Sequence, residues 1–120
     1  MTTVLFIATI VCITANAFVA AADYAEAGFV LANSAEVHVP VNALPTLATL
    51  KASGALGLAV GLLAVPWLGV AAGIGLVLFF VGAIVVHLRA RVLYNIAFPG
   101  AFLLLAMTST AYLTHLAINP

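Results

Sequence analysis

Hydrophobic residues occupy most of this chain in four long stretches, and the segments between these stretches carry nearly all the charged residues. The stretches lie at about 3–22, 46–64, 67–87 and 94–117. Each is close to the length of about 20 residues that an α-helix needs to cross the hydrocarbon core of a bilayer. The pattern therefore predicts a single transmembrane domain over residues 1–120, built as an all-α bundle of four helices.

The order of polar and apolar residues favours helices over the strands of a barrel. Barrel strands alternate between polar and apolar residues, whereas GLVLFFVGAIVV at 75–86 is apolar throughout. A helix also satisfies its backbone hydrogen bonds within itself, as a lipid environment requires.

The connections between the predicted helices differ in length. Residues 64–67 contain a proline and predict a tight turn, which makes the second and third helices an antiparallel hairpin. Residues 88–93 predict a short basic loop. Residues 23–45 predict the one long loop, between the first and second helices. Part of it, 24–32, has the pattern of a short interfacial helix that ends before Asn33.

Composition agrees with a protein that lies in the lipid bilayer. Only 5% of the residues are charged, against about 25% in a soluble domain. The net charge of zero gives no indication of binding to nucleic acid, and we predict no such partner. The first stretch contains the small residues Ala15 and Ala17, but no Lys or Arg precedes it, so we expect a retained helix and no signal peptide.

Glycines indicate where the predicted helices pack closely. Gly57 and Gly61 are four residues apart, as are Gly69 and Gly73. Small residues at this spacing let two membrane helices approach each other. Both pairs lie near the same turn, so we expect them to pack together within the chain. A homo-oligomer contact through the same face is the alternative.

Polar residues of the first two helices fall on narrow stripes at helical spacing. The stripes comprise Thr9, Cys12, Asn16 and Asp23 on the first helix, and Thr46, Thr49 and Ser53 on the second. We expect both stripes to face the bundle interior and to bond across helices, with the lining of a small-molecule cavity as the alternative. Lys51 lies on a different face, and its long stem lets the ammonium reach the interface.

The glycine-rich helices resemble the DoxX family, specifically its DoxX-like small bacterial membrane proteins. The matching features are Lys51-Ala52-Ser53-Gly54, Gly57 and Gly61, Pro66, the third-helix glycines, His87-Leu88-Arg89 and Asn95. The resemblance covers the second to fourth helices and implies four helices in a bacterial inner membrane. Some members are associated with thiosulfate:quinone oxidoreductases or oxidative-stress complexes, and the resemblance carries no catalytic residue onto this sequence.

Charged and polar side chains gather at one end of the predicted bundle and form a candidate site. The site comprises Asp23, Lys51, His87, Arg91 and Asn95. His87 and Arg91 are four residues apart, so we expect them on one helix face. The residues either pair with one another and anchor the bundle, or form the mouth of a polar pocket. In the pocket, Arg91 and Lys51 attract an anionic group and His87 relays a proton.

No motif assigns a metal or a resident cofactor, because the three histidines are scattered and the chain has no CxxC or P-loop. Two functions compete. The first is a non-catalytic accessory or interaction subunit that binds membrane protein partners. The alternative is a redox or quinone-linked subunit with a small polar pocket at the cytoplasmic end. The positive-inside rule places the segments with Lys51, Arg89 and Arg91 in the cytoplasm and both termini outside.

Overall fold

The computed structural model describes residues 1–120 and contains five α-helices, one 3-10 helix and no strand. The helices are α1 (Thr2–Tyr24), α2 (Gly28–Glu36), η1 (Val41–Ala43, the 3-10 helix), α3 (Leu44–Leu63), α4 (Pro66–Arg89) and α5 (Ala97–Ile118). The four longest, α1, α3, α4 and α5, are long and apolar enough to cross a membrane. The prediction of an all-α, multi-pass membrane protein is therefore confirmed.

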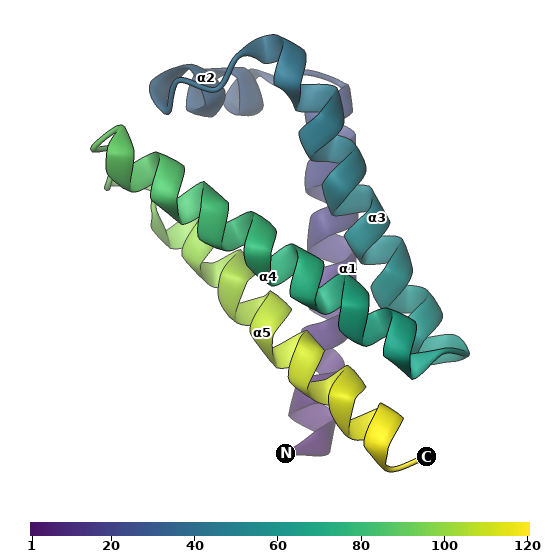
Figure 1. Ribbon diagram of the computed structural model, residues 1–120. Helices are drawn as coiled ribbons and strands as arrows, with labels where there is room; N and C mark the ends of the chain where they lie inside the picture. Colours follow the sequence, from purple (N-terminus) through teal and green to yellow (C-terminus); the bar gives the residue numbers. More distant parts are fainter.

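The four long helices form a bundle in which α1 and α4 occupy opposite corners. α1 packs against α3 and α5, and α4 packs against the same two helices. Figure 1 shows both termini at one end of the bundle and α2 across the other end. The pair formed by α4 and α5 is inclined to α1, so the helices diverge toward α2 (Figure 1).

Prolines lie in the first turn of three of the long helices. Pro45 is the second residue of α3, Pro66 is the first of α4, and Pro99 is the third of α5. The first N–H groups of a helix have no partner within it, so a proline there removes no helical hydrogen bond.

A residue with a left-handed backbone follows three of the helices, two positions after the last helical residue. Glu26, His38 and Arg91 have φ angles of 52°, 63° and 59° and follow α1, α2 and α4. After α4, the backbone N–H of Val92 reaches back to the carbonyl of His87 at 3.0 Å, the pattern of a Schellman motif. The expectation that His87 and Arg91 share a helix face is therefore wrong, because α4 ends at Arg89 and the chain turns at Arg91.

The prediction of a long loop between the first two spans is also wrong. Residues 28–36 form α2 and residues 41–43 form η1. Asn33 does not end the helix, because its side chain accepts a hydrogen bond from Asn95 and Ser34 is buried. Asn33 and Ser34, which the sequence pattern indicated as a helix break, are therefore helical residues that make tertiary contacts.

Glycines bring α3 and α4 into close contact. A Cβ atom added at Gly61 would lie 2.5 Å from the Cα of Gly69, and one added at Gly57 would lie 2.5 Å from the Cβ of Ala72. Gly73, one turn after Gly69, leaves room for Thr110 of α5. These small residues are used in contacts within the chain, where close packing substitutes for the hydrophobic effect that lipid removes.

The polar stripe on α1 faces the interior, as expected, but the side chains of Thr9 and Asn16 bond within α1 and not across helices, whereas Asp23 bonds to Lys51 of α3. Thr9, Cys12, Asn16 and Asp23 are all buried. Asn16 donates to the carbonyl of Cys12, one turn before it, at 2.9 Å.

The expected stripe on α3 is wrong, since Thr46, Thr49 and Ser53 are exposed and Lys51 is buried instead. The hydroxyl of Thr49 donates to the carbonyl of Pro45 at 2.8 Å. A threonine can place its hydroxyl hydrogen within its own helix in this way, and the Thr49 oxygen also accepts a hydrogen bond from the exposed hydroxyl of Tyr24 of α1 at 2.6 Å. The ammonium of Lys51 has no hydrogen-bond partner within α3. Its partner is Asp23 of α1, so the face of α3 that carries Lys51 turns toward α1.

Candidate functional site

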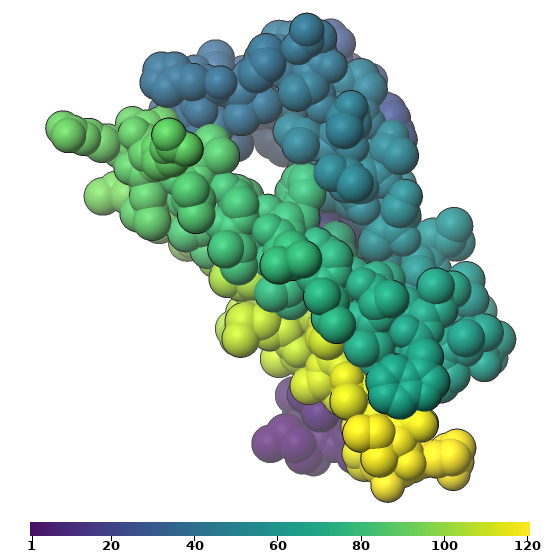
Figure 2. All heavy atoms as spheres, in the orientation of Figure 1, coloured from purple at the N-terminus to yellow at the C-terminus, as the bar shows by residue number.

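A cavity of about 900 Å³ lies where the long helices diverge beneath α2. Figure 2 shows the opening between the blue atoms of α2 and α3 and the green atoms of α4. Most of its lining is hydrophobic and includes Phe79, Phe80, Phe98 and Phe102. Small-molecule sites in proteins typically enclose about 300–1,000 Å³ and are mainly apolar with a few placed polar groups. The cavity has the size and the lining of such a site.

A buried ion pair forms part of the cavity wall. The Nζ atom of Lys51 donates to Oδ2 of Asp23 at 2.8 Å, and the two side chains are 11% and 4% exposed. The ammonium also lies 5.4 Å from the centre of the Phe79 ring, within the range of a cation–π contact. The pair joins α1 to α3 and leaves neither charge unpaired in the interior.

His87 contributes an unpaired nitrogen to the same cavity. The residue is buried, and its Nδ1 lies 2.9 Å from the carbonyl oxygen of Ala83. A carbonyl oxygen can only accept, so Nδ1 carries the hydrogen, and Nε2 of the neutral ring is an acceptor. Nε2 is buried and has no hydrogen-bond partner in the protein.

Asn95, in the link between α4 and α5, contributes a second unpaired acceptor. Its Nδ2 donates to Oδ1 of Asn33 at 3.0 Å, which leaves its own Oδ1 buried without a partner. A buried acceptor without a partner costs about 1–3 kcal/mol. Both unpaired atoms belong to residues that line the cavity, and each can accept a hydrogen bond from a donor that reaches it.

Hydrogen bonds from consecutive residues of the α4–α5 link hold α2 over the cavity. Tyr94 donates to the carboxylate of Glu36, next to the bond between Asn95 and Asn33. The bond to Glu36 is the main reason that the pKa of Tyr94 is raised above its ordinary value, with smaller contributions from desolvation and from the negative charge of the carboxylate. α2 therefore covers the cavity through polar contacts to a short link.

The structure brings four of the five predicted site residues together. Asp23, Lys51, His87 and Asn95 all line the cavity. Arg91 does not, because its left-handed backbone directs the chain away from α4 and leaves the residue exposed. Asn95 precedes α5, which begins at Ala97 and not at Tyr94.

Sequence reasoning missed the residues of α2 and the aromatic partners at the cavity. Asn33 and Glu36 bond to the α4–α5 link, and Phe79 lies beside the ammonium of Lys51. Asn33 and Glu36 are three residues apart and so share one face of a helix. That spacing indicates a polar face on α2, but it does not show that the face is turned toward the bundle.

Comparison with known proteins agrees with the resemblance seen in the sequence. A family model described as the DoxX-like family matches residues 7–109. No curated protein and no solved structure gives a match. The matched range contains all the residues that line the cavity. No three or more His, Cys, Asp or Glu side chains lie close enough together to hold a metal ion.

Proposed function

Since the chain belongs to the DoxX-like family, we propose a function for it within that family. It is a multi-pass membrane subunit that binds a lipid-soluble molecule with a hydroxylated head, of the hydroquinone type, in the cavity beneath α2. This proposal follows the quinone-linked alternative from the sequence and adds a chemical preference for the reduced form.

The observation that carries the proposal is the pair of buried, unpaired acceptors, His87 Nε2 and Asn95 Oδ1, which belong to two residues that line a mainly apolar cavity. The two hydroxyl groups of a hydroquinone are donors and can satisfy such atoms. The carbonyl oxygens of an oxidised quinone are acceptors and leave both unsatisfied. Aromatic residues of the lining, such as Phe98 and Phe102, suit the ring and the first part of an apolar tail.

The proton chemistry of the site is also suited to a hydroquinone. A hydroxyl that donates to Nε2 of His87 places its proton next to a ring nitrogen that can accept it. The hydrogen bond from Nδ1 to Ala83 fixes the ring so that Nε2 is the free nitrogen. His87 is thus the residue we assign to receive or return that proton.

Purification from the membrane followed by mass spectrometry of extracted lipids tests the proposal. His87→Leu removes the unpaired buried Nε2 and also the hydrogen bond from Nδ1 to Ala83, and loss of one such bond costs only about 0.5–1.5 kcal/mol. We expect the purified wild type to retain a hydroxylated lipid-soluble molecule, and His87→Leu to retain its thermal stability and lose the molecule. Arg91→Gln changes a charge outside the cavity and serves as the control. Equal content in wild type and His87→Leu rules out the proposed role of Nε2.

An accessory role in a larger membrane assembly is the second candidate. Gly75 of α4 is exposed, and a Cβ atom added there would meet no atom within 4 Å. An exposed glycine on a membrane helix lets a partner helix approach closely. Gly75→Leu should then reduce copurification of partner proteins without changing the content of bound lipid. Unchanged copurification would remove this argument for a partner at Gly75.

A further inference from the structure

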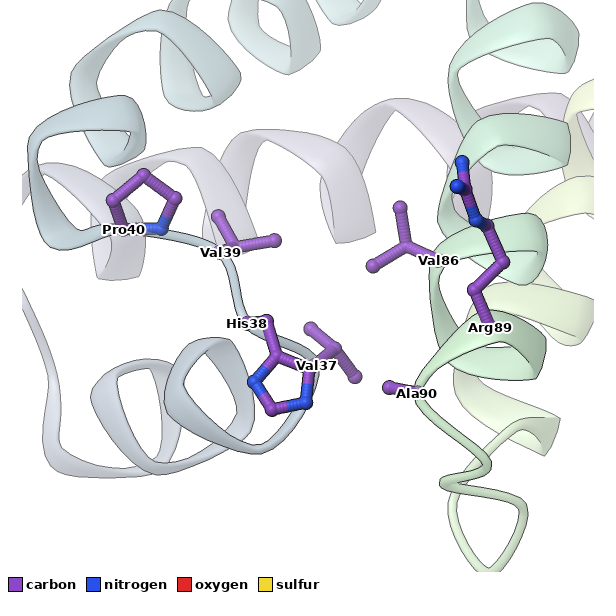
Figure 3. Close-up of a pocket in the computed structure, with 7 residues that line it drawn as sticks. All are labelled: Val37, His38, Val39, Pro40, Val86, Arg89 and Ala90. Carbon is purple, nitrogen blue, oxygen red and sulfur yellow. The ribbon is translucent and has the colours of Figure 1, made fainter.

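A second, smaller cavity lies outside the first, between the segment that follows α2 and the last turn of α4. It has a volume of about 320 Å³. Figure 3 shows the apolar side chains of Val37, Val39 and Val86 at the space between the two walls, with His38 on one wall and Arg89 on the other. The three valines also line the larger cavity, so they separate the two spaces.

The guanidinium of Arg89, at this small cavity, has no counter-ion in the protein. The one ion pair in the structure joins Lys51 to Asp23, so Arg89 lacks a carboxylate partner. The carboxylate of Glu36 accepts a hydrogen bond from Tyr94 and lines only the larger cavity. Arg89 and His38 are both exposed. The cavity therefore presents an apolar floor and an unpaired guanidinium with five N–H donors.

The position of Arg89 along α4 places these groups at the membrane surface. α4 has 24 residues, which makes it about 36 Å long at 1.5 Å per residue. The hydrocarbon core of a bilayer is about 30 Å thick. Arg89 is the last residue of the helix, so we expect its backbone to lie near the depth of the lipid headgroups, where its long, flexible side chain can reach them.

We propose that this cavity binds the phosphate of an anionic phospholipid headgroup. Arg89 holds the phosphate through the paired N–H groups of its guanidinium, the geometry that makes arginine a preferred phosphate ligand. For His38, on the opposite wall, to reach the same phosphate, the Arg89 side chain turns from the course along α4 that Figure 3 shows. Val37, Val39 and Val86 then contact the apolar part of the lipid next to the headgroup. The inference does not depend on the hydroquinone site, because a different cavity and different polar residues carry it.

The chain offers a matched control for the test. Arg91 has the same charge as Arg89, lies two residues further on and is also exposed, but it lines neither cavity. We would measure binding of a short-chain phosphatidylglycerol to the detergent-purified protein by native mass spectrometry, with a phosphatidylcholine of the same chain length for comparison. We expect phosphatidylglycerol to bind more tightly, and Arg89→Gln to weaken it about tenfold or more, as loss of a charged hydrogen bond implies.

The control variants separate a specific site from general attraction. Arg91→Gln should bind phosphatidylglycerol like the wild type, whereas His38→Gln should weaken binding in the same direction as Arg89→Gln. An equal loss in Arg91→Gln, or wild-type binding in Arg89→Gln, would overturn the proposal. Inorganic phosphate is added in a separate series at the same concentration as the lipid. If it displaces the lipid completely, the site recognises a free anion and the assignment to a lipid is wrong.

Discussion

Lys51 of α3 donates a hydrogen bond of 2.8 Å to Asp23 of α1 inside the bundle, at the end where the helices diverge. The bond crosses from the first span to the second and fixes the face that α3 turns inward. It also places one charged pair on the wall of the larger cavity. Stability and site geometry are therefore coupled through these two residues.

Removing one member of this pair should destabilise the protein strongly. Asp23→Asn leaves the ammonium of Lys51 buried without its counter-ion, and a broken buried pair costs about 3–5 kcal/mol. The double variant Asp23→Asn/Lys51→Met should recover much of that loss, because it leaves no unpaired charge. Unfolding in detergent, followed by circular dichroism, measures both. If the single variant is as stable as the wild type, the ion pair is not formed in the folded protein.

The α4–α5 contact gives a second prediction, with a control two residues away. Gly73→Leu should lower the melting temperature in detergent, because the new side chain meets Thr110 of α5. Gly75→Leu should leave the melting temperature nearly unchanged, since a Cβ atom there meets nothing within 4 Å. Equal effects of the two substitutions would show that the packing face of α4 is wrongly placed.

The hydrogen bond from Tyr94 to Glu36 predicts a pH-dependent contribution to stability. The raised pKa of Tyr94 means that the folded protein holds the phenolic proton more tightly than the unfolded chain does. Its contribution is therefore present below the ordinary pKa of about 10 and is lost as the pH rises through the raised value. Tyr94→Phe should melt at a lower temperature than the wild type at neutral pH, and the difference should shrink at alkaline pH. A difference that is constant over this range would contradict the assignment.

The orientation in the membrane is the fourth prediction. Lys51, Arg89 and Arg91 lie toward the end of the bundle covered by α2, and the opposite end has no Lys or Arg. The positive-inside rule then places α2 in the cytoplasm and both termini outside. A C-terminal reporter that is active only in the cytoplasm should stay silent in bacterial cells. Strong reporter activity would reverse the orientation.

The membrane-spanning helices follow from the sequence because lipid imposes a simple requirement. A segment that crosses it must be apolar and must satisfy its own backbone, so hydropathy identifies all four spans. The inward face of α1 was also predictable, since Asn16 and Asp23 are polar groups on one side of an otherwise apolar helix.

The face of α3 and the position of α2 could not be read in the same way. α3 has hydroxyl groups on one side and Lys51 on another, and the choice depends on whether Asp23 of a different helix is within reach. α2 is held by Asn33 and Glu36, whose partners are about 60 residues away in the chain. Contacts at such separations leave no periodicity in a single sequence. The cavity that α2 covers was therefore predicted only as a group of polar residues at one end of the bundle.

Direct binding of a reduced and an oxidised ligand tests whether His87 and Asn95 select the hydroquinone. Isothermal titration would compare a short-tailed hydroquinone, its quinone and its O-methylated hydroquinone with the purified wild type and with His87→Leu and Asn95→Leu. Two acceptors that each cost about 1–3 kcal/mol when unsatisfied predict that wild type binds the hydroquinone at least tenfold more tightly than either analogue. Each substitution should remove much of that preference. Equal affinity for the three molecules, or an unchanged preference in both variants, would contradict the assignment of His87 and Asn95 as ligand-binding residues.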